Sequence, residues 1–143
     1  MWKGNPMNDV VVGVNRSEPA LAAGHSAAKL AAAYGVNLHL VTCAERTPPI
    51  SAGVGSDRFE SDWLTAAEEF LKRLAFDLPH DDVTWNVSSG DPASAILDEA
   101  KRLDAGTIVV GNARTQGASR VLGSVASAVT KKAPCDVLIA HTS

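Results

Sequence analysis

Basic residues, cysteines and long apolar runs are all scarce in this 143-residue sequence. Lysine and arginine number 13 against 16 aspartates and glutamates, so the net charge of −3 provides no basic field to bind nucleic acid. No apolar run reaches the roughly 18 residues that a membrane span needs. Cys43 and Cys135 lie in separate apolar runs, which favours small buried thiols over one disulfide. These scarcities exclude a membrane protein, a disulfide scaffold and a zinc ribbon, and they indicate a cytoplasmic chain.

The familiar signatures of catalytic and nucleotide sites are missing as well. The sequence contains no G-x-x-x-x-G-K-[ST], no G-x-G-x-x-G after its first strand and no G-x-S-x-G. His25, His39, His80 and His141 show no metal-binding spacing, so we interpret them as surface or packing residues. A response regulator would carry an acidic cluster where Asn15 follows the first strand. We therefore expect no enzyme, with slow ATP hydrolysis as the most that the chain would catalyse.

What the sequence does contain is a regular alternation of strand and helix patterns. Residues 1–8 are polar and are expected to form a flexible leader before one domain over residues 9–143. Five strands and four helices in alternation predict a doubly wound α/β domain, in which right-handed crossovers give a parallel sheet between helices. The expected strands cover 9–15, 36–43, 82–88, 107–111 and 136–140, and the expected helices cover 20–34 and 57–78, follow Pro92, and run around 121–129.

Capping residues and apolar spacing support these helices. Ser17 is expected to cap the first helix and Gly35 to end it, while Asp91 and Pro92 form a typical helix start. Apolar residues three and four positions apart predict one buried face on each later helix. The expected inward residues are Phe59, Trp63, Ala66, Ala67, Phe70, Leu71 and Leu74 on the second helix, Ile96, Leu97, Ala100 and Leu103 on the third, and Val121, Leu122, Val125 and Val129 on the fourth.

Two strand ends carry residues suited to a ligand. In doubly wound sheets ligands bind beyond the carboxyl ends of the strands, and these ends are followed by Asn15 and by the segment Gly111–Ser124. Glycines permit close approach of the backbone, a helix N-terminus offers free N–H groups, and Arg114 or Arg120 would neutralise phosphate charge. The plainer interpretation is that any loop from strand to helix tends to contain glycine and serine.

Three stretches of the sequence form one recognisable series: VVVGVNRSEPALAAG, GDPASAILDEA and TIVVGNARTQGASRVLGSVASAVTKKAPCDVLIAHT. Together they resemble the universal stress protein family, and the resemblance runs from about Asp9 to Thr142. The resemblance implies a Rossmann-like fold of the adenine nucleotide alpha hydrolase type, with strand order 3-2-1-4-5. It also implies a homodimer through the last strand, Asp136–Ala140, which would otherwise leave an exposed edge.

One branch of that family binds ATP through G-x2-G-x9-G-[ST], and this chain matches the motif in part. Gly111 matches the first glycine and Gly123-Ser124 the closing pair, but Arg114 occupies the second glycine position and the interval is one residue short. Asn15 stands where many members have aspartate after the first strand. The site that the resemblance implies consists of Asn15, Cys43, Gly111, Arg114, Gly117, Gly123 and Ser124.

Two functions follow as expectations. The first is a small stress-response protein that binds an adenine nucleotide, namely ATP, ADP, AMP or cyclic AMP. The second is a dimeric interaction module of the same fold that binds no nucleotide and acts through its dimer surface and the 45–56 loop, since Arg114 and the shortened motif weigh against phosphate binding.

Overall fold

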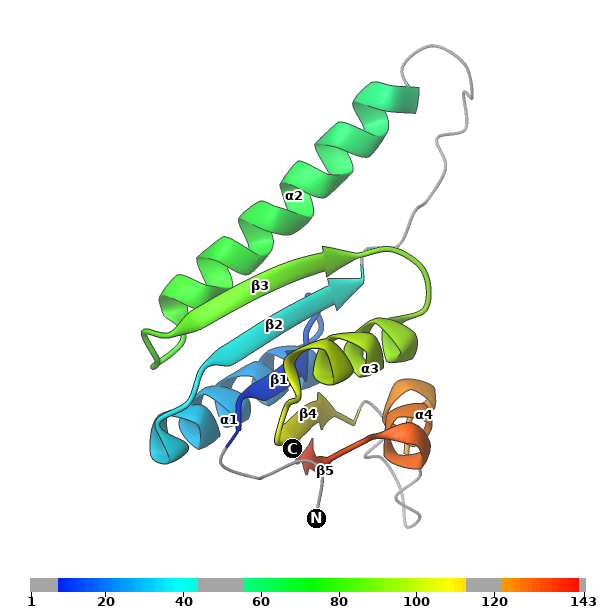
Figure 1. Cartoon of the computed structure of the whole chain (residues 1–143). Coiled ribbons are helices and arrows are strands. Elements are labelled where there is room, and N and C mark those ends of the chain that lie inside the picture. Colours follow the sequence, from blue (N-terminus) through cyan, green and yellow to red (C-terminus); the bar gives the residue numbers. More distant parts are fainter. Residues whose placement is uncertain (1–7, 44–55, 113–121, 142–143) are drawn as a thin grey trace.

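The five apolar runs form five strands in the computed structural model, which describes residues 8–43, 56–112 and 122–141, without the side chains of residues 56–62. The predicted leader therefore falls almost wholly outside the described residues, and so does the predicted 45–56 loop. The strands are β1 (Val10–Gly13), β2 (Leu38–Cys43), β3 (Val83–Ser88), β4 (Thr107–Gly111) and β5 (Asp136–Ala140). Figure 1 shows them side by side between the helices.

All strand pairs are parallel and follow the order β3-β2-β1-β4-β5, which confirms the expected topology. β1 is central: Val10 lies opposite Leu38 of β2 on one side and opposite Thr107 of β4 on the other. Because these three neighbouring strands run in the same direction, their carboxyl ends meet at one edge of the sheet. β3 and β5 are the two outer strands.

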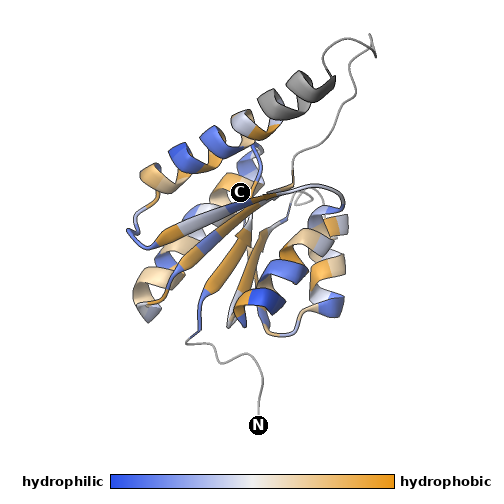
Figure 2. Cartoon of the chain, turned by 45° about the horizontal axis from the view of Figure 1, so that its top comes forward, coloured by the Kyte–Doolittle hydropathy of each residue, from blue (hydrophilic) through white to orange (hydrophobic). Residues whose placement is uncertain are grey.

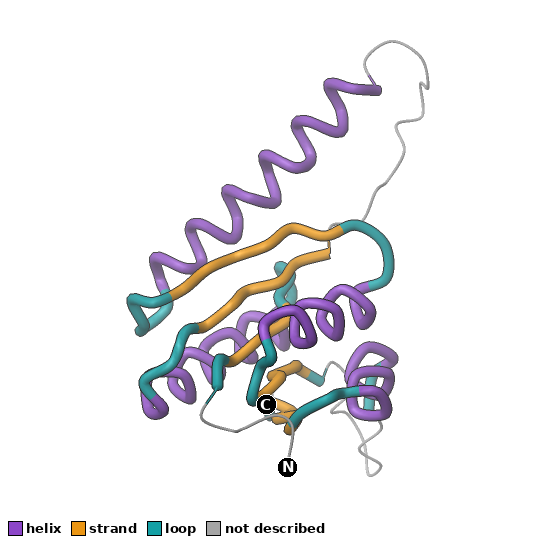
Figure 3. The backbone as a smooth tube through the Cα atoms, viewed as in Figure 1, coloured by secondary structure: helices purple, strands orange, loops and turns teal. Residues whose placement is uncertain are grey.

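The connecting helices begin and end at the residues that sequence chemistry favours. Ser17 caps the start of α1 through a hydrogen bond from the Ala20 N–H at 3.3 Å, and Gly35 ends that helix at φ 69°. Asp91 caps α3 by accepting from the Ser94 N–H at 3.0 Å. The tube in Figure 3 shows the helices lying on both sides of the strands. The helices are α1 (Glu18–Tyr34), α2 (Ser56–Asp77), α3 (Pro92–Leu103) and α4 (Ser124–Lys132).

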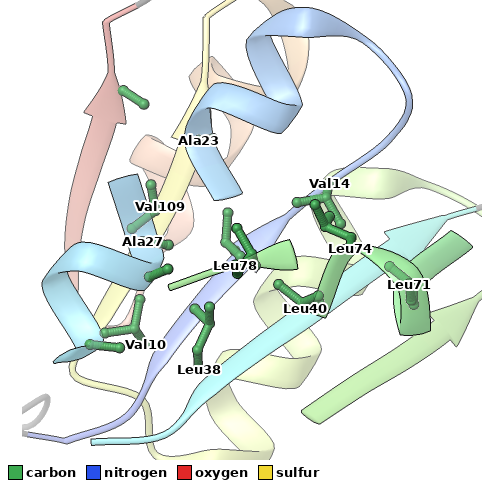
Figure 4. Packing of buried hydrophobic residues seen from close by; sticks show 14 residues of the cluster. Val10, Val14, Ala23, Ala27, Leu38, Leu40, Leu71, Leu74, Leu78 and Val109 are labelled. Atoms are coloured by element: carbon green, nitrogen blue, oxygen red, sulfur yellow. The ribbon is translucent and has the colours of Figure 1, made fainter. Parts of the chain in front are cut away.

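Two hydrophobic layers lie on opposite faces of the sheet. α1 and α2 cover one face, where Leu38, Leu40 and Leu71 are completely buried, and the side chains of this layer are shown in Figure 4. α3 and α4 cover the other face around Ile108 and Val129. Figure 2 shows apolar residues concentrated in the inner strands, while the helices contain both polar and apolar residues. The buried face of α1 consists only of alanine and glycine, so this helix packs close to the sheet.

Two details of the predicted apolar faces are wrong. α4 begins at Ser124, so Leu122 precedes the helix and is 37% exposed, because the connection after β4 runs further than the helical spacing suggested. Ala66 is exposed on α2, while Ala67, Leu71 and Leu74 are buried as expected. Phe59 and Val121 lie outside the described side chains.

Cys43 and Cys135 form no disulfide, as predicted, and both are half-buried where buried thiols were expected. Burial, with the neighbouring Asp136 carboxylate, raises the pKa of Cys135 to about 11. Cys135 is therefore a protonated thiol at neutral pH. None of the helices in the described ranges is long and apolar enough to cross a membrane.

Candidate functional site

A pocket of about 220 Å³ opens where the carboxyl ends of β1, β2 and β4 meet. The chain leaves β1 for α1 on one face of the sheet and leaves β4 for α4 on the other face, so this is the point at which the connections diverge. Five of the seven predicted site residues line the pocket, namely Asn15, Cys43, Gly111, Gly123 and Ser124. Arg114 and Gly117 lie outside the described residues.

The N-terminus of α4 lies at this pocket. Gly123 is the N-cap residue and, having no side chain, makes no side-chain capping bond. The N–H groups of Ser124, Val125 and Ala126 therefore have no acceptor within the helix, and all three residues line the pocket. Together with the positive end of the helix dipole, they form a place for an anion.

The helices α1 and α3 begin differently. Ser17 and Asp91 supply side-chain oxygens to their own first turns, and each of these helices has a proline at its start. Their N-terminal donors are thus partly used by the protein itself. Of the three helix starts whose side chains are described, only that of α4 has no side-chain cap.

Asn112 holds this helix start in place. Its side chain is 7% exposed, and its Oδ1 accepts a hydrogen bond from the Gly123 N–H at 3.0 Å. The bond joins the residue directly after β4 to the N-cap of α4, across the segment 113–121. Sequence reasoning missed Asn112 as an individual residue. The available signal was a polar side chain immediately after a buried strand at the ligand-binding edge.

Gly111 is needed for packing between β4 and α1. A Cβ at this position would lie 2.7 Å from the carbonyl carbon of Pro19 and closer still to its oxygen, and neither backbone atom can move aside alone. The first turn of α1 therefore approaches the end of β4 closely and forms part of the pocket wall. At Gly123 the same atom would meet only the Asn112 Oδ1, at an ordinary 3.7 Å.

Asn15 stabilises the turn between β1 and α1. Its Oδ1 accepts the Ser17 N–H at 2.8 Å, which is the local bond that asparagine and aspartate side chains commonly make in such turns. The Nδ2 amide of Asn15 is a donor that it can offer a ligand, in addition to the second lone pair of its oxygen. An aspartate here could keep the turn but would present a second, charged oxygen instead.

The other end of the pocket is apolar. Val41, Ile96 and Val110 line it from β2, α3 and β4. The Cys43 thiol donates a hydrogen bond to the carbonyl oxygen of Gly90, which ties the end of β2 to the loop before α3. The pocket thus has a polar end at α4 and an apolar end at β2. Such a pocket suits a ligand with an anionic group at one end and an apolar group at the other.

A second hollow of about 510 Å³ adjoins the first and shares Asn15 and Cys43 with it. Trp63 and Phe70 of α2 line this hollow, and the Arg16 guanidinium carbon lies 4.9 Å from the centre of the Phe70 ring. This cation–π contact packs the turn after β1 against α2. The site therefore reaches from α4 to α2 along the carboxyl edge of the sheet.

Ionisable side chains also gather at the opposite edge of the sheet. The His39 ring hydrogen-bonds Asp9 at 2.9 Å and also the Thr84 hydroxyl, and the Asn37 N–H donates to Asp9 at 3.1 Å. Partial burial alone would raise the pKa of Asp9, but these hydrogen bonds outweigh it and lower the pKa. His39 is 9% exposed, in agreement with the interpretation as a packing residue. Within the described residues no group of three or more histidines, cysteines or carboxylates could hold a metal ion.

Curated relatives of the chain are universal stress proteins. One from Mycobacterium tuberculosis is 31% identical over 143 residues, which cover 94% of this chain and 96% of the relative. One from Synechocystis is 38% identical over 78 residues, and that match spans about half of each protein, 52% of this chain and 51% of the relative.

Solved structures agree with this relationship. A crystal structure of a universal stress protein in complex with cyclic AMP has a TM-score of 0.65 at 30% identity, covering 95% of this chain and 98% of that one. A universal stress protein from Archaeoglobus fulgidus in complex with dAMP has a TM-score of 0.64 at 25% identity, covering 93% and 97%. The model of the universal stress protein family matches residues 7–141, so the chain belongs to the universal stress protein family.

Proposed function

We propose that this protein binds an adenine nucleotide in the pocket between β1, β4 and α4. The observation that carries the proposal is the uncapped start of α4, whose first-turn N–H groups of Ser124, Val125 and Ala126 line that pocket. The relatives in complex with cyclic AMP and dAMP support the ligand class, because both ligands combine an adenine with a single phosphate.

In this proposal the phosphate lies against the N-terminus of α4 and the base lies towards β2. Backbone N–H groups and the helix dipole stabilise the phosphate charge, while Val41 and Ile96 provide apolar contact for the adenine ring. The Asn15 amide donates to an acceptor on the base or ribose. Because the described part of the pocket contains neither a metal-binding carboxylate cluster nor a hydroxyl beside a base, we propose binding without turnover.

The test is calorimetric titration with cyclic AMP, AMP and ATP, using Ser124→Asp and Ser124→Asn as a matched pair. The two side chains have similar shapes and both suit a helix start, but only aspartate places a negative charge at the phosphate position. We expect Ser124→Asp to weaken binding by at least about tenfold without loss of thermal stability, and Ser124→Asn to bind nearly as the wild type does. Equal binding by the two variants, or no heat from wild type at millimolar nucleotide, would refute the site.

We also propose that the protein forms a homodimer through β5. Leu138 is 41% exposed on this outer strand, and the strand pairs only with β4 in the described part of the chain. An apolar edge strand of this kind is stabilised when a second copy pairs with it. Light scattering should give a smaller assembly for Leu138→Lys than for wild type, with Ala33→Lys on the exposed face of α1 as the control for added charge. The same mass for all three proteins would refute β5 as the interface.

A further inference from the structure

The sheet has a second outer strand, β3, which is as open to pairing as β5. β3 pairs along Val83–Ser88 with β2 alone in the described structure, so the alternate N–H and C=O groups on its outer side have no strand partner there. Its sequence, VTWNVS, contains no charged residue and no proline, which are the residues by which proteins usually protect an edge strand from pairing. An unprotected strand of six residues is expected to have a partner.

Two large aromatic side chains are exposed beside this edge. Phe76 on α2 is 89% exposed and Trp85 on β3 is 41% exposed. Both line a hollow of about 470 Å³ between the outer surface of α2 and β3, together with Val83. Exposed aromatic residues in a hollow are characteristic of protein interfaces, where they supply much of the buried apolar area. Figure 1 shows β3 at the margin of the sheet with α2 running alongside it.

The charges around this hollow are balanced and of both signs. Lys72 and Arg73 supply two cations, and Glu69 and Asp81 supply two anions to the same rim. A partner of one sign would meet like charge at half of these positions. A second copy related by a two-fold axis carries the same balanced rim, so cations of one copy can pair with anions of the other, which is the self-complementarity that an isologous interface requires.

We propose that β3 and the hollow lined by Phe76 and Trp85 form a second self-association interface, in which β3 pairs antiparallel with β3 of another copy. A two-fold axis perpendicular to the sheet keeps both α2 helices on the same face and brings the two Trp85 side chains together at the junction. This pairing satisfies the free backbone groups of both strands and removes Trp85 and Phe76 from water. With β5 at the opposite edge, a chain that uses both interfaces assembles beyond a dimer.

The test is sedimentation of the full chain with a lysine placed at each edge. We expect wild type to form assemblies larger than a dimer, Trp85→Lys and Leu138→Lys each to stop at a dimer, and the double variant to be a monomer. Phe76→Lys serves as a second probe, because a side chain that is 89% exposed contributes nothing to the core and its replacement leaves the fold intact. It should shift the assembly in the same direction as Trp85→Lys, whereas Ala33→Lys should not.

The outcomes separate the two interfaces. If Trp85→Lys and Phe76→Lys both sediment as wild type does, the β3 interface is wrong, whatever Leu138→Lys does. If the single variant Leu138→Lys is already a monomer, β5 is the sole interface and the β3 proposal also fails. If Trp85→Lys and Phe76→Lys remove an association step that Leu138→Lys leaves in place, β3 is an interface even when the β5 proposal is wrong.

Discussion

Replacing Gly111 by alanine tests the closest approach in the site. The added Cβ would lie 2.7 Å from the Pro19 carbonyl carbon, well inside normal contact, and both clashing atoms belong to the backbone of α1. Relief requires the first turn of α1 to move away from β4 or the end of β4 to bend. Overpacking of this kind costs about 1–3 kcal/mol, and in a domain of this size that lowers the melting temperature by about 3–10 °C.

Two other glycines at this edge provide graded controls. Gly13→Ala meets the Ile96 side chain, with Cγ1 at 2.9 Å and Cδ1 closer, and no backbone atom, so its cost should be smaller than that of Gly111→Ala. Gly123→Ala meets nothing closer than the Asn112 Oδ1 at 3.7 Å, and its φ of −64° suits alanine, so it should lose the least stability of the three, by the modest amount that alanine costs at an N-cap.

The assay is thermal unfolding of the three alanine variants, followed by nucleotide titration of each folded protein. The expected order of loss of stability is Gly111→Ala, then Gly13→Ala, then Gly123→Ala. The nucleotide affinity of Gly111→Ala should fall as well, because the start of α1 forms part of the pocket wall. If Gly111→Ala melts within 1 °C or so of Gly123→Ala, the packing argument is refuted, and a Gly111→Ala variant that is more stable than Gly13→Ala would also contradict it.

Three further predictions concern other parts of the molecule. Asn112→Ala leaves the Gly123 N–H without its acceptor, which should cost roughly 1–3 kcal/mol in denaturant unfolding and weaken nucleotide binding. The pKa of Cys135 is about 11 in the folded protein against the usual 9.0. At pH 8, roughly one Cys135 thiol in a thousand is therefore ionised in the folded protein, against about one in ten in the denatured protein. Mass-spectrometric mapping should find that Cys135 is alkylated about 100-fold more slowly in the folded than in the denatured protein. The pKa of Asp9 is lowered by His39 and lies below 3.8, so its stabilising effect is present above pH 3.8 and lost as the pH falls through the lower folded value. Asp9→Asn should accordingly reduce the melting temperature at pH 7, and this difference from wild type should shrink as acid protonates the Asp9 carboxylate.

Most of the fold could be predicted from local patterns. Ser17, Gly35 and Asp91 mark helix boundaries through bonds within a few residues, and all three caps occur as expected. The alternation of strands and helices led to the sheet class, because crossover handedness leaves few arrangements of parallel strands. The strand order came from the family resemblance, since five short apolar runs do not by themselves state which of them are neighbours.

The start of α4 could not be predicted in the same way. Apolar spacing placed Leu122 on the helix, but the helix begins at Ser124, where the N-cap Gly123 bonds the Asn112 side chain. That bond depends on how the chain returns to the end of β4, and helical periodicity carries no information about it. The same long-range contact makes Asn112 a positioning residue that motif matching did not single out.

The sequence by itself determined the element types, the caps, the apolar faces and the presence of glycine and asparagine at the carboxyl ends of two strands. Only the tertiary structure decided what those residues do. Gly111 leaves room for the Pro19 carbonyl in the pocket wall, the Asn15 oxygen accepts from the Ser17 N–H, and the helix start without a side-chain cap is that of α4. The reason is physical: a residue's chemistry is local, but its partners depend on which distant segments the packed sheet brings together.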